Sequence, residues 1–253
     1  MTPNDFDKSI LEQTGHRPWP MPDSPWVMNQ TWHDLLFAHW PVAADVLRDL
    51  VPPEFPLDLF DNEAWLGIVP FHMTNVTPRG VPSLPWISAF PELNVRTYVR
   101  VGDRPGIFFF SLDAGSSVAV AAARALFNLP YYSANMTVER VGAGVDYQST
   151  RASDDAAEFV ASYAPQGPVF TAAEGTLEYF LTERYCLYHY DHSGAPYRLD
   201  IHHPPWRLQS ARAHLDRNSM ASSVGIEVGE PATLHFSRRQ DMVAWLPSRL
   251  DRA

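Results

Sequence analysis

Alternate residues of one segment, Phe90–Val99, carry the polar side chains that are most specific for chemistry: Glu92, Asn94, Arg96 and Tyr98. Successive side chains of a strand point to opposite faces, so these four would share one face. The arginine could bind a carboxylate through two hydrogen bonds, and the glutamate could accept a proton. Inside a closed sheet such a row would form a ligand site, and outside it would be a solvated face. The spacing alone favours neither alternative.

Two other segments combine charged and aromatic residues. In the first, Arg124–Ala134, a helix end turns at a proline into a strand that starts with Tyr131 and Tyr132, whose phenols could donate to a ligand oxygen. In the second, Glu183 and Arg184 open an aromatic strand. This pair could bind a ligand, or the arginine could form an ion pair with a carboxylate that fixes the end of the strand.

Four histidines and two aspartates occur close together in the sequence, and these residue types are ligands for zinc or iron: His189, His192, His202, His203, Asp191 and Asp200. Their spacing matches no zinc signature such as HExxH, so we expect loop and strand histidines and no metal site. The Ser116–Ser117 pair lacks the GxSxG pattern of a nucleophile elbow and is interpreted as a helix N-cap. No glycine motif for nucleotides occurs, and the sequence predicts no cofactor.

Lysine is almost absent from the sequence. Of the 19 basic residues, Lys8 is the only lysine, and it lies in a segment that reads as a tail. Arginine remains charged and cannot form a Schiff base. We therefore expect no imine chemistry, no pyridoxal phosphate and no P-loop lysine.

The composition is that of an ordinary globular protein, with 253 residues, 45% of them hydrophobic and 19% charged. The single cysteine, Cys186, excludes an internal disulfide framework and cysteine-based metal sites. A net charge of -10 argues against nucleic-acid and anionic-membrane surfaces. No apolar run is long enough to span a membrane, and the N-terminus is polar. We expect a cytoplasmic protein whose partner is a small molecule and which could form a homo-oligomer.

The elements that would position the candidate residues are mostly short strands. Prolines mark residues 1–25 as an extended lead-in, and residues 26–253 are interpreted as one domain. Hairpins are predicted over residues 57–69, 93–110, 132–151 and 185–201, the last three around turns that contain glycine. A nearly uncharged helix over Val118–Phe127 is expected to be buried. Short strands joined by hairpins favour a mainly β, antiparallel barrel or sandwich with a few helices.

The three polar and aromatic segments together resemble one family. Their sequences, ELNVRTYV, RALFNLPYYSA and LTERYCLY with HHPPW, are similar to those of the YqjF-like family of uncharacterised bacterial proteins, and the resemblance runs over most of residues 28–236. It implies a fold like that of acetoacetate decarboxylase: an α+β protein with a cone-shaped antiparallel β-barrel, a central cavity and short flanking helices. It implies no established reaction.

The resemblance also indicates where a site would lie. Acetoacetate decarboxylases form a Schiff base through a lysine in a Gly-aromatic-Pro-Lys-Lys segment, and a glutamate on a cavity strand belongs to the same site. In this sequence the matching segment, Asn128–Tyr132, has tyrosines at the lysine positions, and Glu92 matches the glutamate. A phenol cannot form an imine with a ketone, so Schiff-base decarboxylation is not expected.

Two functions remain open from the sequence. The first is binding of a small organic acid or carbonyl compound in the cavity without Schiff-base chemistry. The second is a lysine-independent lyase, isomerase or hydrolase that acts on a small carboxylate or carbonyl substrate. The catalytic candidates are Glu92 and Tyr131, and the ligand-binding candidates are Arg96, Asn94, Tyr98, Tyr132, Glu183 and Arg184.

Overall fold

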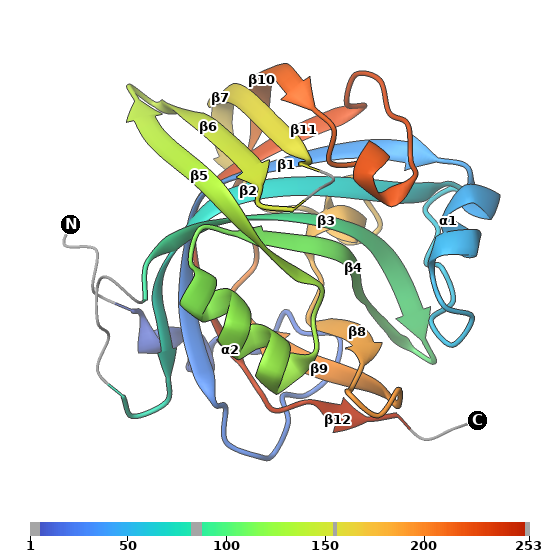
Figure 1. Ribbon diagram of the computed structural model, residues 1–253. Helices are drawn as coiled ribbons and strands as arrows, with labels where there is room; N and C mark the ends of the chain where they lie inside the picture. Colours follow the sequence, from blue (N-terminus) through green and yellow to red (C-terminus); the bar gives the residue numbers. More distant parts are fainter. Residues whose placement is uncertain (1–5, 82–87, 154–155, 251–253) are drawn as a thin grey trace.

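One twelve-stranded sheet dominates the computed structural model, which describes residues 6–81, 88–153 and 156–250 (Figure 1). The strands are β1 (Met28–Val42), β2 (Ala64–Pro78), β3 (Phe90–Val101), β4 (Arg104–Ala114), β5 (Tyr131–Val141), β6 (Gly144–Arg151), β7 (Glu158–Phe170), β8 (Cys186–Tyr190), β9 (Pro196–His202), β10 (Leu208–Asn218), β11 (Thr233–Ala244) and β12 (Ser248–Arg249). The helices are α1 (Ala44–Leu50), α2 (Ser117–Phe127) and α3 (Leu177–Thr182), with short 3-10 helices η1 (Lys8–Glu12) and η2 (Ser222–Val224). None of the helices in the described ranges is long and apolar enough to cross a membrane.

The sheet closes into a ring of strands. Its order is β12-β9-β8-β4-β3-β2-β1-β11-β10-β7-β6-β5, and two additional pairings join β9 to β11 and β4 to β5. The expected antiparallel arrangement is found except at two pairings, β4–β5 and β4–β8, which are parallel. The first exception follows from the connection, because helix α2 carries the chain from β4 back to the start of β5.

Of the four hairpins predicted from the sequence, the one over residues 57–69 does not form, because Leu57 bridges to Val99 and β2 pairs with β1 and β3, which leaves only an isolated Phe60–Glu63 bridge at the turn. The other three are confirmed. They pair β3 with β4, β5 with β6 and β8 with β9, and a glycine with positive φ lies in each turn: Gly102, Gly142 and Gly194. The sequence analysis does not predict β7 or β10, which pair with each other. The side chains of β10 that pack on the main core include Ala211 and Ala213, and alanine is a weak β-strand former.

The centre of β1 is buried on both faces. Leu36 and Ala38 enter the largest apolar cluster, whereas Leu35 and Phe37 enter a second cluster. The sequence of a strand that is covered on both faces is a continuous run of apolar residues, without the alternation of a half-buried strand. The second cluster includes Phe71 and borders the cavity described below, so β1 joins the cavity wall to the main core.

Helix α2 is largely exposed, contrary to the expectation from its sequence. Ser116 caps its N-terminus by accepting a hydrogen bond from the Ala119 amide at 3.3 Å, as predicted. Within α2 only Val120 is buried, while Val118 and Leu126 are 63% and 70% exposed. The helix lies in front of the strands in Figure 1, and its inner side borders an open cavity where a core would otherwise pack. The apolar side chains of α2 are therefore exposed because the helix faces the cavity and not a packed core.

The described part of the N-terminal segment packs on the sheet. Ile10 of η1 is buried in a cluster with Val243 and Trp245, and its carbonyl lies 2.7 Å from His202 Nε2. Trp19 joins a separate cluster and is also buried. The Ile10 contacts involve strands β9 and β11, whereas the Trp19 cluster includes residues of β3, β4 and β8.

Candidate functional site

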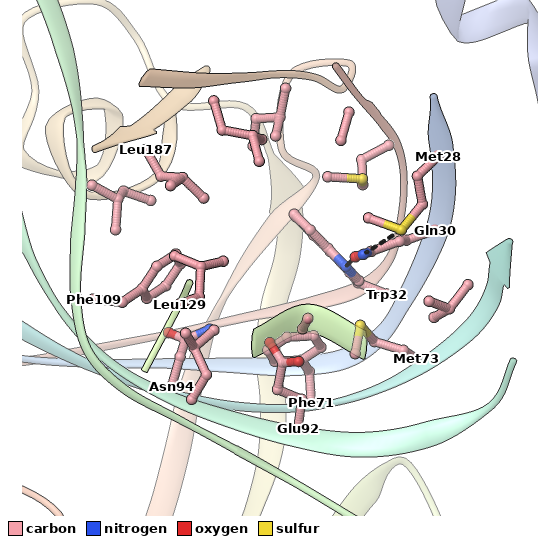
Figure 2. Close-up of a pocket in the computed structure, with 18 of the residues that line it drawn as sticks. Met28, Gln30, Trp32, Phe71, Met73, Glu92, Asn94, Phe109, Leu129 and Leu187 are labelled. Carbon is pink, nitrogen blue, oxygen red and sulfur yellow. Dashed lines mark hydrogen bonds between the residues drawn. The ribbon is translucent and has the colours of Figure 1, made fainter. Parts of the chain in front are cut away.

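A cavity of about 310 Å³ lies between the inner face of strands β1–β3 and helix α2. This volume is at the lower end of the range for small-molecule sites. Figure 2 shows Glu92, Asn94 and Phe71 along one side of the cavity, with Gln30 and Trp32 along another. Most of the remaining lining is aliphatic or aromatic, so the few polar groups define where a ligand would be recognised.

The polar row of β3 faces into this cavity and is not a solvated face. Glu92, Asn94 and Arg96 line it and are only 4%, 4% and 7% exposed. Tyr98 continues the same face but lies outside the cavity wall, because α3 covers that end of the strand. The Tyr98 hydroxyl donates to the Leu181 carbonyl at 2.9 Å, and the residue is fully buried.

Glu92 and Tyr131 form a hydrogen-bonded pair in the cavity wall. The Tyr131 hydroxyl donates to Glu92 Oε2 at 2.9 Å. The local chain explains the contact: α2 ends at Asn128, which has a left-handed φ of 50°, and the chain then enters β5 with Tyr131 opposite Leu112 of β4. Because side chains alternate along β5, Tyr131 points into the cavity and its neighbour does not.

Burial shifts the acid–base properties of this pair. It raises the pKa of Glu92 to about 8, an effect that the Tyr131 hydrogen bond opposes and the charge of Asp113 reinforces. Burial, together with the charge of Glu92, also raises the pKa of Tyr131 well above 10. At neutral pH both groups are therefore uncharged, so Glu92 is a carboxylic acid that can donate as well as accept a hydrogen bond.

Three arginines are buried among the described residues, and two of them have a carboxylate partner. Arg151 Nη2 lies 2.8 Å from Asp113 Oδ1, and Arg184 Nη1 lies 2.6 Å from Asp58 Oδ2. Arg96 forms no ion pair with any carboxylate of the described chain, and its Nε has no hydrogen-bond partner there. A buried charge is unfavourable without a counter-charge. Arg96 is thus the group in the cavity that most requires an anion.

Neutral groups hold the Arg96 guanidinium at one end of the cavity. Its Nη2 donates to the Leu181 carbonyl at 3.1 Å and to the Tyr98 hydroxyl at 3.4 Å. The Tyr98 hydroxyl also lies 2.6 Å from His39 Nε2. Burial, and then the charge of Arg96, lower the pKa of His39 well below its usual range. His39 is therefore neutral and supplies no second charge.

The Glu183–Arg184 pair is divided between the cavity wall and the structure behind it. Arg184 reaches the cavity, but its Nε donates to the Phe180 carbonyl at 2.6 Å and its Nη1 contacts Asp58. Glu183 lies outside the lining and accepts a hydrogen bond from the Trp206 amide at 2.9 Å. Arg184 thus pairs with an aspartate that is distant in the sequence. The charged groups of both Glu183 and Arg184 are engaged in contacts within the protein.

Tyr132 lies outside the cavity lining. The Arg151 guanidinium is 4.0 Å from the centre of its ring, and the same guanidinium pairs with Asp113. Tyr132 therefore covers a buried ion pair through a cation–π contact.

Trp206 is a cavity residue whose role the sequence analysis does not predict. Its indole Nε1 is buried and has no partner in the described chain, as is also true of Asn94 Oδ1. The ring stacks on Trp32 with 5.8 Å between ring centres, and Trp32 Nε1 donates to Gln30 Oε1 at 2.7 Å (Figure 2). The HHPPW segment marks Trp206 in the sequence, but only the fold brings it to the polar row.

The histidines considered as metal ligands are separated in the structure. Among the described residues, no group of three His, Cys, Asp or Glu side chains could hold a metal ion. His202 Nε2 and His203 Nε2 lie 2.7 Å and 3.2 Å from the carbonyls of Ile10 and Arg184, respectively. Their ring nitrogens are therefore engaged with backbone on different segments.

Gly67 allows the close approach of His39 and Arg96, which lie opposite it on the two neighbouring strands. A Cβ at this position would lie 3.0 Å from His39 Nε2 and 3.3 Å from Arg96 Cγ. We expect Gly67→Ala to lower the free energy of unfolding by about 1–3 kcal/mol, because the added methyl displaces the His39 ring and the Arg96 stem. Urea denaturation would measure the effect.

Gly229→Ala provides the matched control, since a Cβ there meets nothing within 4 Å. If Gly67→Ala is as stable as Gly229→Ala, the close approach of His39 and Arg96 does not depend on the missing Cβ.

The fold, with a cavity enclosed by a ring of strands, is that of the acetoacetate decarboxylase-like proteins. The chain resembles the enduracididine biosynthesis enzyme MppR complexed with pyruvate (TM-score 0.62, 11% identity, 94% of this chain and 93% of that chain). It also resembles an acetoacetate decarboxylase-like enzyme from Sphingomonas wittichii RW1 (0.60, 12%, 94% and 98%) and acetoacetate decarboxylase from Legionella pneumophila (0.58, 14%, 99% and 98%). At these identities the similarity concerns the fold alone.

The sequence assigns the chain to a particular family within this fold. Residues 29–241 match the DUF2071 family, which is described as an uncharacterized conserved protein. The chain is 46% identical over 226 residues to the uncharacterized protein YqjF of Bacillus subtilis strain 168, and the match covers 89% of this chain and 93% of that protein. The chain belongs to the DUF2071 family, and the resemblance to YqjF-like proteins is confirmed.

Proposed function

We propose that this protein binds a small organic acid in a cone-shaped barrel cavity, with Arg96 as the group that receives the carboxylate. The observation that carries the proposal is the absence of an ion-pair partner for Arg96, in contrast to the other two buried arginines of the described chain. A bound carboxylate would supply the missing counter-charge and could accept two hydrogen bonds from the guanidinium. The apolar walls would strengthen this interaction by excluding water.

The proposal does not involve a covalent intermediate through lysine. Lys8 is the only lysine in the sequence; it lies in η1, is exposed and is not part of the cavity lining. Tyr131 occupies the position that the family resemblance assigns to a lysine, and its phenol donates to Glu92. MppR has been crystallised with pyruvate, which supports a cavity of this fold as a site for a small acid.

We further propose that residues 26–253 form a single domain, which binds the ligand, and that residues 1–25 form an extended segment that precedes it. A small molecule in the cytoplasm is the partner that the acidic composition and the enclosed site favour. In this proposal neither nucleic acid nor a membrane surface takes part.

A second function is favoured by one specific observation, the raised pKa of Glu92. A carboxylic acid with a pKa of about 8 is suited to donate and recover a proton near neutral pH. With Tyr131 as its hydrogen-bonding partner, Glu92 could serve a lysine-independent lyase, isomerase or hydrolase on a small carboxylate or carbonyl substrate. Turnover of such a substrate that is lost in both Glu92→Gln and Tyr131→Phe would establish this function, and turnover that survives both changes would refute it.

Carboxylate binding is expected to depend on Arg96. Thermal denaturation should show that pyruvate or hexanoate raises the Tm of the wild type, and that Arg96→Gln weakens the binding by about 10- to 100-fold through loss of the charged hydrogen bonds. Arg212→Gln, which changes an exposed arginine of β10, is the control and should bind normally. Equal binding by Arg96→Gln, or a covalent adduct trapped by borohydride in the cavity, would contradict the proposal.

A further inference from the structure

We infer that the ligand is an elongated monocarboxylate, with its carboxylate at Arg96 and an uncharged oxygen several carbons away at Glu92 and Tyr131. The inference rests on the proposed function and specifies the ligand class. It follows from the separation of the two recognition groups, the character of the wall between them and the charges at the two ends.

The two recognition groups lie far apart along β3. Residues 92 and 96 are four positions apart on one strand, which corresponds to about 13 Å between their Cα atoms. Their side chains are held in different directions: the Arg96 guanidinium bonds to the carbonyl of Leu181 at the α3 end, and the Glu92 carboxyl bonds to Tyr131 at the start of β5.

One short acid cannot reach both groups. Side chains of a strand stand roughly perpendicular to the sheet, so the two functional groups are separated by about the same 13 Å as the Cα atoms. Allowing about 3 Å for a hydrogen bond at each end leaves a span of roughly 7 Å, and an extended chain advances about 1.2 Å per bond. The two oxygens of a ligand that contacts both ends are therefore about six bonds apart. In a β-keto acid the two functional groups are much closer than this.

The wall between the two ends is mainly apolar. Phe71, Phe109, Leu112 and Leu129 line the cavity beside the polar row. Asn94 provides the one polar side chain of the β3 face between the two ends, through its unpaired Oδ1. A hydrocarbon spacer fits such a wall, because burial of each methylene is favourable and a polar spacer would lose its hydrogen bonds to water.

The charges at the two ends differ, which makes the ligand a monoanion. Arg96 supplies one positive charge without a counter-ion among the described carboxylates, whereas Glu92 is protonated at neutral pH. A second carboxylate placed beside Glu92 would be buried with no cation to pair with it. A hydroxyl, carbonyl or ester oxygen would instead accept a hydrogen bond from the protonated Glu92.

Calorimetric titration of the full-length protein with three homologous series would test the inference: straight-chain monocarboxylates, ω-hydroxy monocarboxylates and dicarboxylates, each from about four to ten carbons. For the plain acids we expect the affinity to rise by about fourfold per methylene until the cavity is filled. At the matching length the ω-hydroxy acid should bind about fivefold more tightly than the plain acid, and the dicarboxylate more weakly than both.

Glu92→Leu is expected to abolish the gain from the ω-hydroxyl, and circular dichroism would show whether the variant is folded. If Glu92→Leu does not fold, the wild-type length profile tests the inference alone. An affinity that is highest for the four-carbon acids and falls with length, or that is independent of length, would overturn the inference and leave the proposed function standing. Failure of every carboxylate to bind would remove both.

Discussion

A Glu92→Gln variant is expected to exceed the wild-type stability by only about 1 kcal/mol near pH 5 and by roughly 4–5 kcal/mol near pH 9. Burial places the pKa of Glu92 at about 8 in the folded protein instead of the model value of 4.5. Between these two values the folded state holds a proton that the unfolded state has lost. The wild type therefore loses about 1.4 kcal/mol of stability for each pH unit over this window, while glutamine, which resembles the protonated acid, does not titrate.

Urea denaturation of both proteins from about pH 5 to pH 9 would measure this difference. The buried histidines, such as His202 and His203 with pKa values lowered to about 4 by burial, are present in both proteins and cancel in the comparison. Glu139→Gln, at an exposed position of β5, is the matched control and should show a difference that does not change with pH. A constant difference for Glu92→Gln as well would mean that Glu92 is ionised in the folded protein.

The same titration has a consequence for ligand binding. While Glu92 is protonated it can donate to a ligand oxygen and does not repel an incoming anion. Above about pH 8 its ionisation adds a negative charge to the cavity wall, so carboxylate affinity should fall in the wild type and remain constant in Glu92→Gln. The pH dependence of the stability and that of carboxylate binding thus both report on the protonation of Glu92.

The sequence predicts the polar row of β3 because a strand alternates its side chains strictly. The alternation brings Glu92, Asn94 and Arg96 to one face, and the structure turns that face into the cavity. The pattern cannot indicate where the cavity stops. Tyr98 obeys the same alternation, but α3 covers it, and that helix comes from a segment about eighty residues later in the chain. Tyr131 and Tyr132 illustrate the same rule, since adjacent residues of a strand cannot both face inward.

Other features could not be predicted because they depend on tertiary contacts. The apolar composition of α2 indicates burial, but the hollow beneath it leaves Val118 and Leu126 exposed. Strand β10 was missed because alanines supply much of its core contact. The pairing of Arg184 with Asp58, instead of the adjacent Glu183, joins residues that are 126 positions apart. No local pattern distinguishes such a paired arginine from the unpaired Arg96.

This distinction between arginines leads to a second strong prediction. Arg96→Met is expected to leave the ligand-free protein as stable as the wild type or more stable by about 1–3 kcal/mol, although it removes carboxylate binding. Methionine keeps the buried alkyl volume and eliminates a charge that lacks a counter-ion among the described residues. The Leu181 carbonyl, which loses the Arg96 donor, still accepts a hydrogen bond from the Tyr98 hydroxyl at 2.9 Å.

Arg151→Met is the matched control, and the opposite sign is expected. Arg151 and Asp113 are 2% and 0% exposed at their side chains and lie 2.8 Å apart, so removing the arginine leaves a buried carboxylate without its principal counter-charge. Loss of one partner of such a pair costs about 3–5 kcal/mol. Urea denaturation of the two variants without ligand compares the same substitution at two buried arginines. Equal destabilisation would mean that the fold itself compensates Arg96, and the argument for an anion site in the cavity would lose its basis. If Arg96→Met stabilises the protein and Arg151→Met destabilises it, the charge of Arg96 lowers the stability of the ligand-free protein. That is expected when the counter-ion of Arg96 is the ligand.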